Sequence, residues 1–266
     1  MSLAGAALAA LAARADAHDF WIEPASWRPA PSSILQVRLK VGDFALGDEV
    51  PRDEGRILRF ELAGAGLERP IVGRDGGTPA GFVRLPEGGV HVLGYEGRPA
   101  RVELDAAKFE AYLRKRGLDE VLAERAGTGE ARRGVRESYA RCAKSIVRVD
   151  GQGAGGWDRA LGLALELVPE GPPRATAGGG AELELRLVHR GGPLEGALVR
   201  AMPLKGPVPE ADVLSVRTGA GGRTRLQLPH PGPWLVASVH MRRAPAGADC
   251  DWESLWASLT LEVAEP

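Results

Sequence analysis

The amino-acid sequence predicts a mainly β protein made of two β-sandwich-like domains, with a short helical insertion in the first. One observation is the composition, because 36 glycines and 20 prolines among 266 residues suit many short strands joined by tight turns. The other is an alternation of apolar and polar residues along much of the chain, which has the period of a β-strand. Hydrophobic residues make up 44% of the sequence, enough to form a core.

Residues 1–17 have the features of a secretory signal peptide. An apolar, alanine-rich stretch precedes Ala15 and Ala17, which occupy the small-residue positions of a cleavage site. The stretch is shorter than the about 20 apolar residues that a membrane-spanning helix needs. We therefore expect a periplasmic protein that does not span the membrane and whose mature chain begins at His18. An amphipathic N-terminal helix of a cytosolic protein is the alternative.

The first domain is expected over residues 18–155. Leu35, Val37 and Leu39 alternate with polar residues, as in a strand with one exposed face. Comparable alternation, separated by glycine-rich turns, occurs in residues 58–62, 90–92 and 101–104. These runs predict an antiparallel sheet.

The helical insertion is expected over about residues 105–143. Asp105 is suited to cap a helix that ends at Gly117, because Phe109, Tyr112 and Leu113 recur at helical spacing. Apolar residues three and four apart extend this expectation to residues 118–126 and 130–143, whereas residues 144–149 return to strand character.

A polar, glycine-rich stretch at residues 150–156 predicts the boundary between the two domains. The second domain, residues 156–266, is expected to be an all-β sandwich of the immunoglobulin-like kind. Its alternating runs are residues 161–167, 183–187, 234–241 and 252–263.

Charge and motifs argue against several classes of function. The chain carries 34 basic and 35 acidic residues, a net charge of -1, so nothing in its charge favours nucleic acid or anionic lipid as a partner. It contains no Gly-x-Ser-x-Gly elbow, no His-Glu-x-x-His pair and no phosphate-binding loop. We therefore expect no enzymatic activity. Cys142 and Cys250 leave both one disulfide and two buried thiols open.

Several segments resemble a bacterial family of unknown function that is described as the periplasmic component of nickel or cobalt uptake systems. They are residues 18–24 (HDFWIEP), 140–145, 234–241 and 251–260. This resemblance implies that the protein handles a metal and has an inner-membrane metal transporter as partner. Residues 192–199 and 218–226 are similar to the carboxypeptidase-regulatory type of β-sandwich, in which aspartate often stands where this chain has Gly219 or Ala220.

Four residues are candidate metal ligands: His18, His91, His240 and Asp251. After cleavage, the α-amine of His18, whose ordinary pKa is about 7.7–8.0, and its imidazole Nδ1 would chelate one ion. A second imidazole, from His240, would complete a nitrogen-rich site suited to nickel, cobalt or copper.

Asp251 or Glu253 would add an oxygen ligand or orient an imidazole. Each of these residues also has a structural interpretation, which is favoured for His91. His189 and His230 are interpreted as incidental.

The leading hypothesis is a periplasmic binding protein or accessory subunit that captures a divalent transition metal, nickel or cobalt, for uptake. A non-catalytic structural or adhesion-like module is the alternative, since a β-sandwich does not determine function. A copper-dependent oxidase with an N-terminal histidine brace is a third interpretation.

Overall fold

The computed structural model describes residues 18–64, 66–149 and 155–265. The predicted signal peptide, residues 1–17, and most of the predicted linker lie outside these ranges. The described residues form eighteen strands and two α-helices, which confirms the mainly β class. No helix among the described residues is long and apolar enough to cross a membrane.

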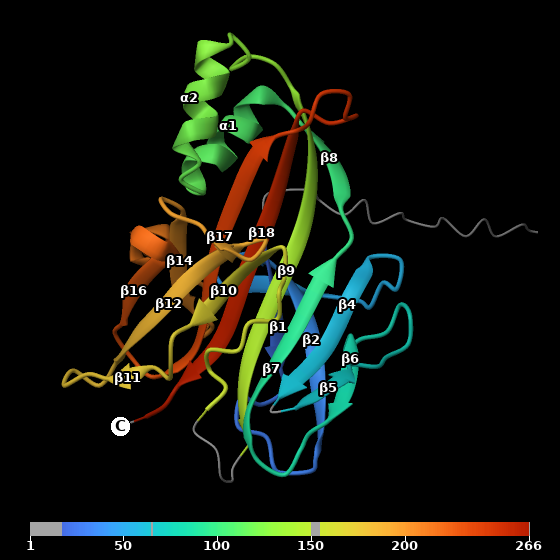
Figure 1. Cartoon of the computed structure of the whole chain (residues 1–266), viewed down its shortest axis with the longest axis vertical. Coiled ribbons are helices and arrows are strands. Elements are labelled where there is room, and N and C mark those ends of the chain that lie inside the picture. The colour runs from blue at the N-terminus through green and yellow to red at the C-terminus, as the bar shows by residue number, and fades with distance from the viewer. Residues whose placement is uncertain (1–17, 65, 150–154, 266) are drawn as a thin grey trace, which may run out of the picture.

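A nine-stranded sheet forms the middle layer of the molecule (Figure 1). Its strand β9 (Val135–Val149) pairs over residues 135–139 with β8 (Ala100–Leu104) and over residues 142–149 with β7 (Gly89–Gly97). The order of the strands is β15 (Leu214–Arg217), β14 (Leu198–Pro203), β17 (Gly232–Arg243), β18 (Trp252–Val263), β9 (Val135–Val149), β7 (Gly89–Gly97), β4 (Ile57–Gly64) and β5 (Leu67–Pro70), with β8 (Ala100–Leu104) paired to β9.

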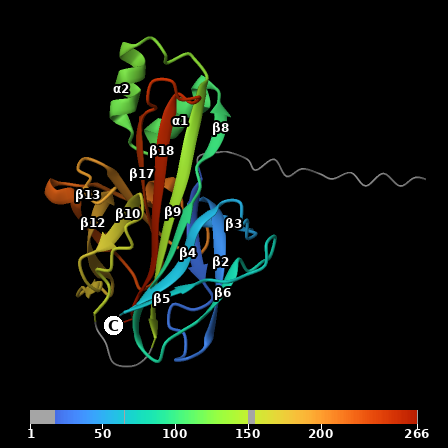
Figure 2. The ribbon, with the colours of Figure 1, turned by 45° about the vertical axis from the view of Figure 1, so that its right-hand side comes forward.

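Two smaller sheets cover the central sheet, one on each side (Figure 2). One consists of β1 (Asp19–Pro24), β2 (Ile34–Asp43), β3 (Leu46–Val50) and β6 (Gly81–Arg84). The other consists of β10 (Leu165–Pro169), β11 (Arg174–Ala175), β12 (Ala181–His189), β13 (Gly192–Pro193) and β16 (Arg223–Leu228).

The alternation along each central strand supplies both cores. On the face that we call the C-terminal face, Leu185 of β12 packs in one cluster with Val236 of β17 and Leu259 of β18. On the opposite, N-terminal face, Ile22 of β1 packs in a cluster with Val147 of β9. Burial of about 25 cal/mol per Å² of apolar surface makes these two layers the main stabilising contacts.

Helices α1 (Ala106–Lys115) and α2 (Asp119–Gly127) cover the N-terminal face at one end of β17 and β18 (Figure 1). As predicted, the carboxylate of Asp105 caps α1 by accepting from the backbone N–H of Lys108 at 2.8 Å. Gly117 follows the helix at φ +64°, a conformation that favours glycine. Phe109, Tyr112 and Leu113 are the buried face of α1. Two single 3₁₀ turns also occur, Glu210–Asp212 and Ala220–Gly222.

The helical prediction for residues 130–143 is wrong, because β9 begins at Val135. Val135 and Tyr139 are four residues apart, a spacing that fits a helix and a strand face equally well. Their face of the strand packs against the helices.

The predicted domain boundary falls between β9 and β10, but the central sheet runs across it. β18, the last strand of the chain, pairs in parallel with β9 over nine residue pairs from Trp252↔Glu137 to Thr260↔Ser145. The two predicted domains therefore share one sheet. This register also fixes which residues lie on each face, since Val239, Trp256 and Arg141 are aligned on one side.

Candidate functional site

The candidate functional site is a pair of histidines on the C-terminal face. His240 is aligned with Leu255 in the next strand and has the parity of Trp234 and Val236, which lie in the C-terminal core. His189 is the last residue of β12, the strand that covers this face. The centroids of the two imidazole rings are 4.5 Å apart and the rings are inclined by 52°.

The two rings line a cavity of about 110 Å³ at the end of β12, over strands β17, β18 and β9. Arg190, Arg242 and Glu253 also line it. The guanidinium of Arg242 is neutralised by Glu253, whose carboxylate oxygen Oε2 lies 2.6 Å from Nη2. Neither imidazole makes a hydrogen bond or ion pair with another residue in the described part of the chain, which leaves their nitrogens available to a ligand.

Burial and nearby positive charge favour the neutral form of both histidines. Burial is the main cause that lowers the pKa of His240 to about 4, and the neighbouring His189, Arg242 and Arg190 lower it further. Burial likewise lowers the pKa of His189, with contributions from Arg190 and Arg242. A neutral imidazole retains the lone pair that binds a metal.

His18 lies in a different, charged environment. Its Nδ1 is 2.8 Å from Oδ2 of Asp43, and the other oxygen of that carboxylate is 2.8 Å from Nζ of Lys115. Burial raises the pKa of Asp43, but contacts with Lys115 and Arg116 outweigh it and hold this pKa below its ordinary value. The Nδ1 atom that a chelate with the α-amine would need is therefore already bonded to Asp43, which disfavours a histidine brace.

The central sheet separates His18 from His240. Arg116, 3.5 Å from Asp43, stacks over the ring of Trp256 at 4.8 Å, and Trp256 packs with Val239 on the N-terminal face. His240 follows Val239 directly and is on the opposite face. The expectation of one ion shared by His18 and His240 is therefore wrong for this structure.

His91 is buried and held within the first half of the chain. Its Nε2 is 2.9 Å from the carbonyl oxygen of Gly88, and burial lowers its pKa. A Cβ placed on Gly64 would lie 2.4 Å from Nδ1, so the backbone of β4 closes off this nitrogen. The structural interpretation of His91 fits these contacts better than the ligand interpretation.

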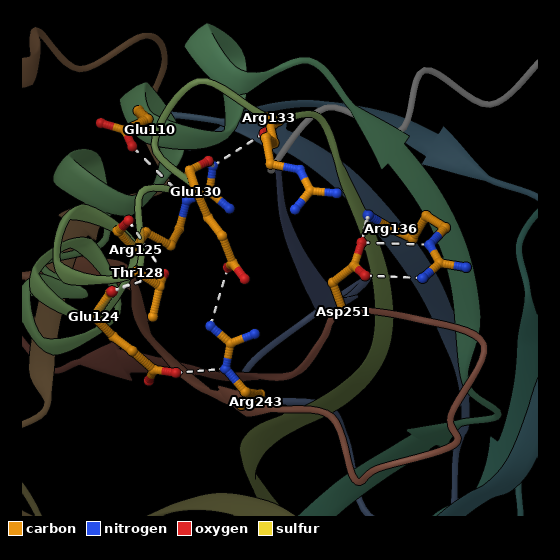
Figure 3. A network of polar contacts seen from close by, with 9 residues as sticks. All are labelled: Glu110, Glu124, Arg125, Thr128, Glu130, Arg133, Arg136, Arg243 and Asp251. Atoms are coloured by element: carbon orange, nitrogen blue, oxygen red, sulfur yellow. Dashed lines mark hydrogen bonds and ion pairs between the residues drawn. The ribbon is translucent and has the colours of Figure 1, made fainter.

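Asp251 joins the loop before β18 to strand β9. Figure 3 shows its carboxylate directed at Arg136, with Oδ1 2.8 Å from Nη2 and Oδ2 accepting from the backbone N–H at 2.8 Å. This pairing lowers the pKa of Asp251. Nearby, Arg243 binds Glu124 and Glu130 and so ties β17 to the helical segment (Figure 3). The carboxylate of Asp251 is thus occupied by a strand contact.

The described residues hold no cluster of three or more histidine, cysteine, aspartate or glutamate side chains that could bind a metal. The four predicted ligands therefore do not converge on one site. Cys142 and Cys250 are both buried free thiols, so of the two alternatives left open, the structure has the unpaired one.

Comparison with known families gives a match over most of the chain. The model of the family described as a domain of unknown function, DUF4198, matches residues 15–242. The chain belongs to this family.

Other comparisons add little to the DUF4198 assignment. A solved structure, the "D0-D1 domain of Intimin", aligns at 10% identity over 91% of this chain and 97% of its own, with a TM-score of 0.21. A TM-score of this size supports no inference. Comparison with curated proteins gives no match.

His189 is the residue of this DUF4198 chain that sequence reasoning missed. It shares the parity of Leu183, Leu185 and Leu187, which signals an inward-facing side chain at the end of a strand. What it faces is decided by how β12 packs over β17, two elements more than forty residues apart, and no local pattern encodes that contact.

Proposed function

We propose that this protein is a non-catalytic periplasmic binding protein or accessory subunit that captures a divalent transition metal at His189 and His240. The observation that supports the proposal is the contact of two neutral imidazoles, 4.5 Å apart at their centroids, in one cavity. The proposed role is the metal binding expected from the sequence, but the proposed site lies on the face of the central sheet opposite His18.

The donor set favours nickel, cobalt or copper. Imidazole nitrogens suit these ions, whereas calcium and magnesium require several oxygen ligands. Two protein ligands leave the other coordination positions to water or to a partner. This incomplete coordination suits an ion that is passed on, and an inner-membrane metal transporter is the proposed recipient.

The two arginines that line the cavity repel a bound cation only weakly. The charge of Arg242 is offset by Glu253, and Arg190 is exposed to solvent, where its charge is screened. The two imidazoles are held by strands β12 and β17, so little ordering accompanies binding.

Isothermal titration calorimetry with Ni²⁺, Co²⁺ and Cu²⁺ tests the proposal. His189→Ala and His240→Ala should each weaken binding by about ten-fold or more, roughly 1.4 kcal/mol. His230→Ala is the matched control, since His230 is an exposed histidine whose Nδ1 lies 3.3 Å from the carbonyl oxygen of Pro231. Mg²⁺ and Ca²⁺ should give no comparable heat.

His18→Gln is a second control because it lies on the opposite face. Binding that is lost in this variant and kept in His240→Ala would place the metal at the N-terminus and overturn the proposal. Absence of binding by the parent protein would leave a structural or adhesion-like module as the function.

A further inference from the structure

A second cavity lies on the N-terminal face, and its lining residues differ in kind from those around the histidine pair. It has a volume of about 180 Å³ and lies between β1, β4, β7 and β9. Nearly half of the lining residues are aromatic residues or arginines. They are Phe20, Tyr95 and Tyr139, and Arg56, Arg98 and Arg141, with Asp53 as the one carboxylate.

Arg141 is the central charged group of this cavity. Its guanidinium stacks over the ring of Phe20 at 5.0 Å and over that of Tyr139 at 5.4 Å. Among the described residues no carboxylate forms an ion pair with it and no group accepts a hydrogen bond from it. Burial lowers the pKa of Arg141, yet a guanidinium stays charged in proteins. A half-buried, unpaired guanidinium is a costly arrangement that an anion would relieve.

The rim adds further positive charge. The backbone N–H of Arg98 donates to the carbonyl oxygen of Arg56 at 2.7 Å, so the two side chains leave neighbouring backbone positions. Asp53 is exposed, and its Oδ2 is 4.0 Å from Nε of Arg56. An exposed ion pair at this distance is weak. Charge at the mouth of the cavity is therefore net positive.

Tyr95 supplies an apolar wall and a hydroxyl. Its ring packs against Phe20 with centroids 4.9 Å apart and against Phe60 at 5.7 Å. Burial raises the pKa of Tyr95 to about 12, so the hydroxyl keeps its proton and can donate to an anion. A Cβ on Gly97 would lie 3.3 Å from this hydroxyl, so a side chain at this position would crowd it.

We infer that this cavity binds a small aromatic carboxylate, with the carboxylate on Arg141 and the ring among Phe20, Tyr95 and Tyr139. The forked guanidinium matches the two oxygens of a carboxylate. The volume is near that of cavities of about 150 Å³ that hold one benzene ring. Arg141 and His240 are on opposite faces of the central sheet, and the two cavities share Tyr139 in their linings.

Two-dimensional ¹H–¹⁵N NMR of the processed protein, titrated with benzoate, tests this inference. Benzoate should shift the amide signals of residues 95–98 and 139–141. Benzamide, which has the same shape without the charge, should bind at least about ten-fold more weakly, as should benzoate with Arg141→Met. Arg141→Lys should be intermediate, because it keeps the charge and loses the fork.

Arg132→Met is the matched control because Arg132 is exposed and outside the cavity. If Arg141→Met unfolds the protein, Arg98→Gln at the exposed rim replaces it and should still weaken benzoate binding. Equal binding of benzoate and benzamide, unchanged binding in the variants, or binding of inorganic phosphate as tight as that of benzoate would each overturn the inference. So would the absence of shifts at millimolar benzoate.

Discussion

The ammonium of Lys144 on β9 lies 2.8 Å from the carboxylate of Glu166 on β10, and both side chains are 1% exposed. Glu166 also accepts from the backbone N–H groups of Leu161, Gly162 and Leu163, while Lys144 donates to the carbonyl oxygen of Arg159 at 2.9 Å. This buried pair and its hydrogen bonds hold residues 159–166, which follow the predicted domain boundary, against the central sheet.

Lys144→Met should destabilise the protein by about 3–5 kcal/mol, because it leaves the Glu166 carboxylate buried without its cation. Urea unfolding measures the change. Arg174→Met is the control, since Arg174 forms an exposed ion pair with Glu182 that should contribute less than about 1 kcal/mol. Similar losses in the two variants would contradict the assigned role of the buried pair.

Glu137 should make stability fall as the pH rises. Its carboxylate accepts from Tyr112 and Ser254, and burial raises its pKa from 4.5 to about 6. The folded state holds this proton more tightly than the unfolded state does. The contribution of Glu137 to the free energy of unfolding is therefore fully present below pH 4.5 and is lost as the pH rises through about 6.

Glu137→Gln should remove this dependence, about 2 kcal/mol between the two limits. The measurement is urea unfolding of parent and variant at a series of pH values. Glu103→Gln, an exposed position on β8, should keep the slope of the parent. Identical pH profiles for the parent and Glu137→Gln would rule out the raised pKa.

Alanine substitutions at Gly129 and Gly117 distinguish the cost of a strained backbone from the cost of a steric clash. Gly129 has φ +72° and open space where a Cβ would stand, whereas at Gly117, φ +64°, a Cβ would lie 2.8 Å from Cδ2 of Leu198. Gly129→Ala should cost about 1 kcal/mol, and Gly117→Ala about 2 kcal/mol or more because Leu198 must also shift. Thermal unfolding compares the variants, and equal losses would contradict the close packing at Gly117.

Export predicts a specific mature N-terminus. Mass spectrometry of the protein recovered from the periplasm should find His18 as its first residue, because Ala15 and Ala17 have the spacing of a cleavage site. Recovery of the chain with residue 1 intact in a cytosolic fraction would contradict this prediction.

Local alternation predicted the individual strands well, because the period of two survives wherever one face of a strand is buried. β2 and β12 follow the alternation that the sequence shows, whereas β18 is buried on both faces from Trp256 to Leu261. The first half of β9 has an apolar spacing that also fits a helix, and its Glu137 is buried rather than exposed, so the pattern there predicts a helix where the structure has a strand.

The pairing of strands was beyond sequence reasoning. The parallel contact of β9 with β18 joins segments more than a hundred residues apart, and nothing local specifies it. The same limit applies to the candidate site. Strand parity correctly placed His240 beside Trp234 and Val236, but its partner His189 comes from another sheet, and the expected partner His18 lies across the central one.

Electron paramagnetic resonance of the protein loaded with one equivalent of Cu²⁺ tests the proposed metal site most directly. Nitrogen superhyperfine splitting reports how many imidazoles coordinate the ion. The parent should show two coordinated nitrogens, and His189→Ala and His240→Ala one each, while His18→Gln and His230→Ala should keep two. A spectrum of hydrated copper, or one that neither His189→Ala nor His240→Ala alters, would contradict a metal held by this pair.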